Sequence, residues 1–200
     1  QGVSSAASDV YKRQDMHCLP HMLGDGSAST FHATFFPGCS SLLAPDPAVI
    51  DLFTSFRATG PGGNFSVEQT ETVQTTRLDD IADLPLADFI KIDVQGAELA
   101  VLENGVSVLA NALVIDCEVE FIPLYKDQPL FSDIDRFLRS QGFLLHRMLD
   151  VSGRCFRPVT LADPTIPVSQ WLWADAVFVR DFVRLEHWSD LQLVKGAAIL

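Results

Sequence analysis

The chain has 200 residues, 48% of them apolar and 20% charged, which is the composition of a single globular domain. Its formal charge is -12, from 14 basic and 26 acidic residues. This balance excludes a protein whose main partner is a nucleic-acid backbone, because Lys and Arg side chains neutralise phosphates and no run of basic residues is present.

The cysteines and the apolar segments indicate the compartment. No two of Cys18, Cys39, Cys117 and Cys155 have the Cys-x-x-Cys spacing of a zinc site, so we expect no bound metal. Cys117 lies in an apolar run and is interpreted as a core residue. No apolar stretch reaches the roughly 20 residues that cross a bilayer, and no signal peptide opens the chain. We therefore expect a cytoplasmic protein with reduced thiols and no membrane partner.

Both ends of the chain differ from ordinary structural elements. Residues 4–14, SSAASDVYKRQ, show neither a helical nor a strand period and resemble the translation of an adapter used to prepare DNA sequencing libraries. The alternative is a disordered native N-terminus. We assign residues 1–14 to the adapter and exclude them from the fold. We expect residues 15–183 to form a partial domain and residues 184–200, which end without a stop signal, to begin a truncated helix.

The first half is expected to contain β segments around a loop. Residues 16–43 are typical of a β-hairpin, with β-forming side chains concentrated over 30–36. Residues 44–65 are rich in Pro and Gly and predict a loop around a short helical turn. Residues 65–76 alternate like a strand, and residues 78–81 begin a short helix with acids near its N-terminus.

The second half alternates strands with helices. The expected order is strand 89–94, helix 97–103, strand 112–119, helix 130–140, strand 143–149 and strand 172–179. This pattern predicts an α/β fold with an open, mostly parallel sheet covered on both faces. The last two strands follow each other without a helix, so the last strand is expected to be antiparallel. The Trp171-x-Trp173 pair leads into this last strand with the alternation of a strand, and both residues are interpreted as core residues.

Acidic residues follow two neighbouring strands where each strand ends. Asp93 ends the strand in DFIKIDVQGAE, Gly96 lets the next helix begin close to the sheet, and Glu118 and Glu120 end the following strand. Ligands of open α/β sheets bind outside the carboxyl ends of the strands. Burying an unpaired carboxylate there for stability alone is costly. We therefore expect these acids to face a cationic or hydroxyl-bearing ligand.

Structural roles are the alternative for the same residues. Lys91 and Asp93 share a strand face, so the two side chains could simply pair. Glu98 stands in the first turn of a helix and could serve only the helix dipole. At least one of Glu118 and Glu120 is expected to point to solvent.

Three longer segments resemble the FkbM-type methyltransferases in their order and spacing. These segments are TTRLDDI (75–81), FIKIDVQGAELAVLENG (89–105) and VIDCEVEFIPLYKDQPLFSDIDRFLRSQGF (114–143). PGCSSL (37–42) and WLWADAVFVR (171–180) are also similar, so the resemblance covers most of residues 16–183. KIDVQGAE is its most specific part, although the family more often has Glu where Gln95 stands.

The resemblance implies a Rossmann-like fold that uses S-adenosylmethionine to methylate a hydroxyl group of a small molecule, usually a sugar or secondary metabolite. Such an enzyme aligns the acceptor oxygen with the sulfonium methyl group, and a carboxylate near the acceptor can take the hydroxyl proton. It implies catalytic roles for Asp93 and Glu118, cofactor contacts for Asp93 and Gly96, and acceptor contacts for Glu120 and Tyr125.

The resemblance also implies a glycine-rich cofactor loop, which this sequence does not contain. Residues 60–63, GPGG, follow no apolar strand and are not expected to open a helix, so they are not that loop. We therefore expect an N-terminally truncated sheet with half of the cofactor pocket missing. The 200-residue chain should bind S-adenosylmethionine poorly or not at all and should be inactive alone; micromolar binding in calorimetry would contradict this.

Two other functions remain as alternatives. One is another Rossmann-type enzyme, such as a nicotinamide-dependent oxidoreductase, although an antiparallel last strand favours the methyltransferase. The other is a non-catalytic binding domain.

Overall fold

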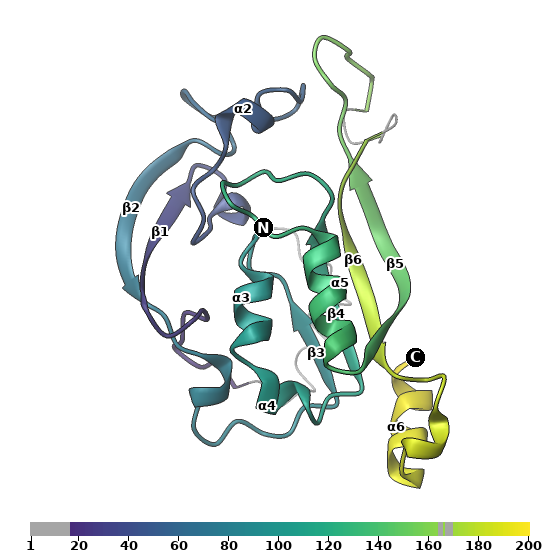
Figure 1. Cartoon of the computed structure of the whole chain (residues 1–200). Helices are drawn as coiled ribbons and strands as arrows, with labels where there is room; N and C mark the ends of the chain where they lie inside the picture. Colours follow the sequence, from purple (N-terminus) through teal and green to yellow (C-terminus); the bar gives the residue numbers. More distant parts are fainter. Residues whose placement is uncertain (1–16, 164–165, 167–169) are drawn as a thin grey trace, which may run out of the picture.

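The computed structural model describes residues 17–163, 166 and 170–200, so the predicted adapter segment lies outside the described residues. The elements are β1 (Ala28–Thr34), η1 (Pro37–Cys39), α2 (Pro47–Ile50), β2 (Val67–Gln74), η2 (Leu78–Asp80), β3 (Phe89–Ile92), α3 (Glu98–Glu103), α4 (Val106–Leu109), β4 (Val114–Glu120), α5 (Phe131–Ser140), β5 (Phe143–Gly153), β6 (Trp171–Arg180), η3 (Leu185–His187) and α6 (Asp190–Ile199) (Figure 1). No helix among them has both the length and the apolar character that crossing a membrane requires.

The main sheet has four strands in the order β3-β4-β6-β5. Strand β3 pairs with β4 in parallel, whereas β6 pairs antiparallel with both β4 and β5. The antiparallel last strand is confirmed. The expected mostly parallel sheet is not confirmed, because only one of the three strand pairings is parallel. Strand β6 follows β5 without a crossover helix and inserts between β4 and β5, which both run in the opposite direction. The fold is therefore α/β with a mixed sheet.

Helices α3, α4 and α5 cover one face of this sheet (Figure 1). The helical period of α5 places Ile134 and Leu138 on its inner side, where both are buried. They pack on alternate residues of β4, which are Ile115, Cys117 and Val119. Cys117 is fully buried, so its predicted core position is confirmed. This layer fixes the direction in which β3 and β4 present their carboxyl ends.

The opposite face is covered only in part by the described residues. Val114 of β4 is buried there together with Val177 and Val179 of β6, against side chains of the C-terminal segment. Farther along, Lys91 Nζ lies 3.0 Å from Asp175 Oδ1 and 3.4 Å from Asp116 Oδ1. The expected helical cover of both faces is therefore incomplete, and this face carries charged side chains near the middle of the sheet.

Trp171 and Trp173 lie on that same face of β6. Trp173 packs against a hydrophobic core that includes Phe56, as predicted, whereas Trp171 is not a core residue. The side chain of Trp171 is 53% exposed, and Trp173 is half-buried, whereas Leu172 and Ala174, which point to the other side, are buried. For Trp171 the prediction was wrong, because strand alternation shows that two residues share a face but does not show how far that face is covered.

A second, two-stranded sheet is formed by β1 and β2, which pair antiparallel from Ala28↔Gln74 to Thr34↔Val67. The expected hairpin within residues 16–43 is therefore wrong, because the partner of β1 lies more than thirty residues farther along the chain. The predicted strand near 65–76 and the short helical turn within 44–65 are confirmed as β2 and α2.

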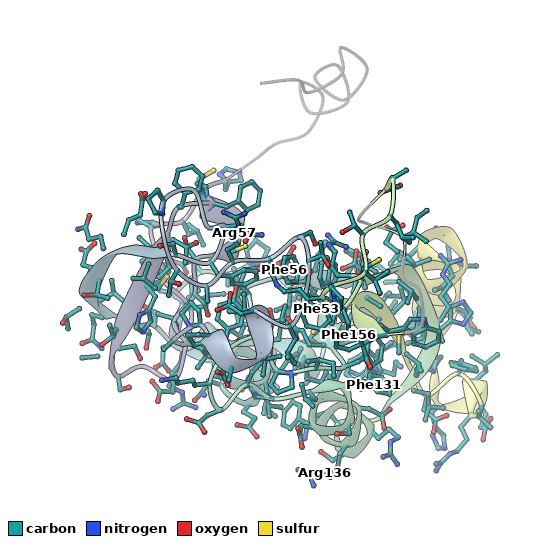
Figure 2. All side chains as sticks on the ribbon, turned by 90° about the horizontal axis from the view of Figure 1, so that it is seen from above. Phe53, Phe56, Arg57, Phe131, Arg136 and Phe156 are labelled. Carbon is teal, nitrogen blue, oxygen red and sulfur yellow. The ribbon has the colours of Figure 1, made fainter. Side chains whose placement is uncertain are left out.

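The segment between the two strands, residues 35–66, packs over the residues that follow β4. Asp46 N donates to Leu124 O at 2.9 Å, and Lys126 N donates to Ala44 O at 2.8 Å. Its aromatic side chains contribute to a second core. Phe53 of this core stacks on Phe156, a partly exposed residue after β5, at a ring distance of 4.9 Å (Figure 2). The segment thereby closes over the carboxyl ends of the strands where acidic residues were expected.

Candidate functional site

The turn that follows β3 has a defined and unusual conformation. Gln95 and Gly96 both have positive φ angles, of 56° and 96°, and only glycine adopts this region without strain. Ser41 Oγ donates a hydrogen bond of 2.6 Å to the Gln95 carbonyl. Glu98 Oε1 accepts from the backbone N–H groups of Val94 and Gly96 at 2.9 and 3.1 Å. Glu98 is buried, so it holds this turn in addition to standing at the start of α3.

Close packing requires glycine at position 96. A Cβ atom there would lie 2.9 Å from Gln128 Nε2 and 3.3 Å from Tyr125 Cδ2. Gln128 Oε1 in turn accepts from the backbone N–H groups of Leu124 and Tyr125. The loop after β4 therefore approaches the turn so closely that it leaves little room for a side chain at position 96. A direct cofactor contact of Gly96 stays a prediction.

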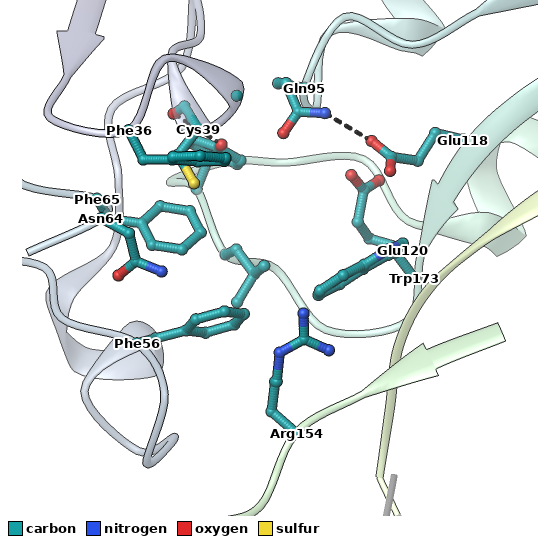
Figure 3. A pocket seen from close by; sticks show the side chains of 13 residues that line it. Phe36, Cys39, Phe56, Asn64, Phe65, Gln95, Glu118, Glu120, Arg154 and Trp173 are labelled. Atoms are coloured by element: carbon teal, nitrogen blue, oxygen red, sulfur yellow. Dashed lines mark hydrogen bonds between the residues drawn. The ribbon is translucent and has the colours of Figure 1, made fainter. Parts of the chain in front are cut away.

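The side-chain amide of Gln95 joins the ends of β3 and β4. Its Nε2 donates to Asp93 Oδ1 at 2.8 Å and to Glu118 Oε2 at 2.9 Å (Figure 3). The two acids therefore lie at the same edge of the sheet, as expected from the parallel pairing. The alternative that Asp93 only neutralises Lys91 is wrong, because Lys91 contacts Asp116 and Asp175.

Glu118 and Glu120 both point toward the segment 35–66. Glu118 is half-buried and Glu120 is 4% exposed, so the expectation that one of them points to solvent is wrong. Residues two apart in a strand share a face, and segment 35–66 covers that face. Among the described residues Glu120 Oε2 has no hydrogen-bond partner.

Burial and mutual repulsion make this cluster weakly acidic. Burial, followed by the charges of Asp93 and Glu98, raises the pKa of Glu118 to about 8. Burial also raises the pKa of Glu120, together with the charges of Glu98 and Glu118. A carboxyl group with a pKa near neutrality can exchange a proton with a ligand or become ionised when a cation binds.

A cavity of about 230 Å³ lies between the acids and the aromatic side chains of segment 35–66 (Figure 3). Its lining includes Gln95, Glu118, Glu120, Tyr125, Arg154, Trp173, Phe36, Phe56 and Phe65. The acids and Gln95 form one wall and the aromatic rings form others. We call this space the acidic-aromatic cavity.

A second cavity, of about 320 Å³, lies on the other side of the same turn. Its lining includes His21, Met22, Phe31, Ser40, Ser41, Asp93 and Gln95. Gln95 lines both cavities, Asp93 lines the second, and Glu118 lines the acidic-aromatic cavity. The hydrogen-bonded group Asp93–Gln95–Glu118 therefore stands between two spaces that could each hold a small molecule.

Tyr125 lines the acidic-aromatic cavity, but its hydroxyl group has a protein partner. Tyr125 Oη donates to the Cys39 carbonyl at 2.9 Å, and the residue is 2% exposed. Burial raises the pKa of this hydroxyl. The geometry gives Tyr125 a structural role, and its predicted contact with an acceptor stays a prediction.

Sequence reasoning missed most of the cavity wall. It noted Gln95 only as a departure from the family pattern and did not assign Arg154 or the aromatic residues of segment 35–66 to the site. One signal was present: Phe53, Phe56 and Phe65 lie in a segment interpreted as a loop, and several large apolar residues in a loop indicate a second core.

Comparison with known proteins agrees with the geometry. A family model described as the methyltransferase FkbM domain matches residues 28–145. This range runs from β1 into β5 and contains the Asp93–Gln95–Glu118 group. No curated protein and no solved structure matches the chain.

Proposed function

This chain belongs to the FkbM methyltransferase family, and we propose that its site transfers the methyl group of S-adenosylmethionine to a hydroxyl oxygen of a small molecule, such as a sugar or secondary metabolite. One observation carries the proposal: the amide of Gln95 holds Asp93 and Glu118 together between two cavities. Methyl transfer requires adjoining sites for the two molecules, direct contact between the acceptor oxygen and the methyl carbon, and a proton acceptor beside the hydroxyl.

Glu118 is the proposed proton acceptor. It faces the acidic-aromatic cavity, and burial together with the neighbouring acidic charges raises its pKa to about 8. A base whose pKa lies near the working pH combines a useful ionised fraction with sufficient basicity. Glu118 takes the proton from the acceptor hydroxyl as the oxygen becomes nucleophilic. Gln95 and Asp93 fix the orientation of its carboxylate.

The cofactor supplies an electrophilic methyl group when it is bound. S-adenosylmethionine carries a sulfonium and an ammonium group, and the Asp93 carboxylate on the cavity of about 320 Å³ suits this positive charge. Asp93 and the side chain of Gln95 would hold that part of the cofactor, while Gly96 permits the turn that presents them. The sequence has no G-x-G-x-x-G motif, so we propose that the 200-residue chain binds the cofactor weakly.

Transfer of a labelled methyl group tests this function. The chain is incubated with millimolar S-adenosyl-[methyl-³H]methionine, which compensates for weak binding, and with a panel of sugars, phenols and amino alcohols. The missing glycine-rich loop alone predicts an inactive chain, but the proposed site predicts residual activity when millimolar cofactor offsets the weak binding. We therefore expect label in at least one hydroxyl acceptor and strong loss of label with Glu118→Gln. Glu71→Gln, an exposed carboxylate on β2, serves as the matched control. Absence of labelled product from the whole panel would contradict the proposal.

The missing glycine-rich motif favours a second candidate, a non-catalytic binding domain. Ligand binding to the acidic-aromatic cavity without methyl transfer would support this candidate. For either function we propose a cytoplasmic location, which is supported by the four free cysteines.

A further inference from the structure

Glu120 is a buried carboxylate with one oxygen atom that forms no hydrogen bond to the described residues. It is 4% exposed, and its Oε2 atom has no hydrogen-bond partner among them. Figure 3 shows this carboxyl group directed into the acidic-aromatic cavity, next to Glu118. A buried polar atom without a hydrogen-bond partner destabilises the fold, so its retention in a cavity points to a ligand that supplies the missing partner.

The basic side chains near this cavity are engaged elsewhere. Arg154 lines the cavity, but its Nη1 donates to the Gly153 carbonyl at 2.6 Å, and its guanidinium lies 4.6 Å from the ring centroid of Trp173. Burial lowers the pKa of Arg154, and the negative charge of Asp163 opposes this shift. Lys91 is held by Asp116 and Asp175. The acids therefore lack a positive partner from the described residues that line this cavity.

The other walls are aromatic and suit a ligand with an apolar part. Phe56 contacts Phe65 at a ring distance of 5.2 Å and Trp173 at 6.2 Å. Trp173 stands directly opposite Glu120 in the β4–β6 pairing. The Arg154 guanidinium already lies over the rings of Trp173 and Phe56, at 4.6 and 5.4 Å from their centroids. The carboxylate of Glu120 is therefore the group that is left to bind an organic cation, and the aromatic rings offer apolar contacts.

We propose that the acceptor is an amino alcohol, with a protonated amine bound by Glu120, an apolar ring against Phe56 and Phe65, and its reacting hydroxyl at Glu118. The hydroxyl assignment rests on the proposed function, whereas recognition of the amine does not. Glu118 and Glu120 are two residues apart on β4, so their Cα atoms stand about 7 Å apart. The amine and the hydroxyl of the acceptor are therefore separated by only a few bonds.

Recognition of a cation also predicts a release of protons. Burial raises the pKa values of Glu118 and Glu120, and a bound ammonium group favours their ionised forms. The complex therefore loses protons to the buffer at neutral pH. A neutral ligand in the same cavity has no such effect.

Calorimetry without cofactor tests the inference with two matched probes, 2-phenylethylammonium and its neutral counterpart 2-phenylethanol. We expect the ammonium to bind roughly 10- to 100-fold more tightly, the range for one charge-assisted hydrogen bond. Its binding heat should depend on the ionisation enthalpy of the buffer, which reveals proton release. Glu120→Gln should remove both the preference and the proton release, and Glu71→Gln should change neither.

Three results would each overturn the inference: equal affinity for both probes, a preserved ammonium preference in Glu120→Gln, or no ammonium binding at millimolar concentration. Circular dichroism verifies that the variant is folded. If it is not, the affinity ratio of the two probes and the buffer dependence measured on the unchanged chain decide the question. Amine binding without labelled transfer would contradict the proposed function alone, and transfer to hydroxyl acceptors with no preference for amines would contradict this inference alone.

Discussion

Gln95 Nε2 donates a hydrogen bond of 2.9 Å to Glu118 Oε2, across the ends of two adjacent parallel strands. The same nitrogen donates to Asp93 Oδ1 at 2.8 Å. One amide therefore holds two carboxylates together that would otherwise repel each other. This group is the structural element on which the proposed chemistry depends.

Two substitutions of Gln95 distinguish the stabilisation by its side-chain hydrogen bonds from the strain of its backbone conformation. Gln95→Ala removes both hydrogen bonds but keeps the strained φ of 56°, and we expect it to lower the free energy of unfolding by about 1–3 kcal/mol. Gln95→Gly removes the same bonds but relieves the strain, so its loss should be about 1 kcal/mol smaller. Denaturant unfolding measures both variants. A larger loss for Gln95→Gly would contradict this conformation.

The raised pKa of Glu118 predicts how stability depends on pH. Its pKa is about 8 in the folded state and near 4.5 when the chain is unfolded, so the folded state binds more protons between these values. The free energy of unfolding contributed by this group therefore falls as pH rises from about 4.5 to about 8, with a slope of at most about 1.4 kcal/mol per pH unit.

Glu118→Gln should make this pH dependence shallower. It should not abolish it, because burial raises the pKa values of Glu98 and Glu120 in the same direction. Urea unfolding at several pH values between 4.5 and 8 provides the comparison, with Glu71→Gln as control. An unchanged slope in Glu118→Gln would show that this carboxyl group titrates normally in the folded chain.

Tyr125→Phe tests the connection between segment 35–66 and the residues after β4. The variant loses the hydrogen bond of 2.9 Å to the Cys39 carbonyl and leaves that carbonyl without this partner. We expect the free energy of unfolding to fall by about 1 kcal/mol. Thermal unfolding followed by circular dichroism measures the change. Unaltered stability would argue against this buried contact.

The affinity for S-adenosylmethionine is expected to be low. Asp93 and Gln95 offer contacts to its positive charge, but no glycine-rich motif is present in the sequence to supply backbone N–H groups. Calorimetry should therefore give a dissociation constant well above the micromolar range. Micromolar binding would show that other residues of this chain form a sufficient cofactor site.

The sequence predicted the acidic edge because a strand and its carboxyl-terminal acid are local features. The apolar run before Asp93 and the run before Glu118 define β3 and β4, and parallel pairing then brings their ends together. The antiparallel direction of β6 relative to β5 also followed from a local feature, since no helix separates the two strands. These predictions needed no knowledge of distant contacts.

The cavity could not be predicted from local features because its walls come from segments that are far apart in the sequence. Phe56 and Phe65 precede β3, while Arg154 and Trp173 follow α5. Their meeting depends on how segment 35–66 folds over the sheet, which neither a period nor a motif encodes. The same contacts bury Glu120, which strand alternation alone could not show.

The most direct test of the central claim is the rate of methyl transfer to a responsive hydroxyl acceptor at pH 8, compared between the unchanged chain and Glu118→Gln. Loss of a general base typically slows a reaction by about 10²- to 10⁴-fold, and we predict a decrease in this range with the fold intact. An unchanged rate in a folded Glu118→Gln variant would contradict the assignment of this carboxylate as the proton acceptor.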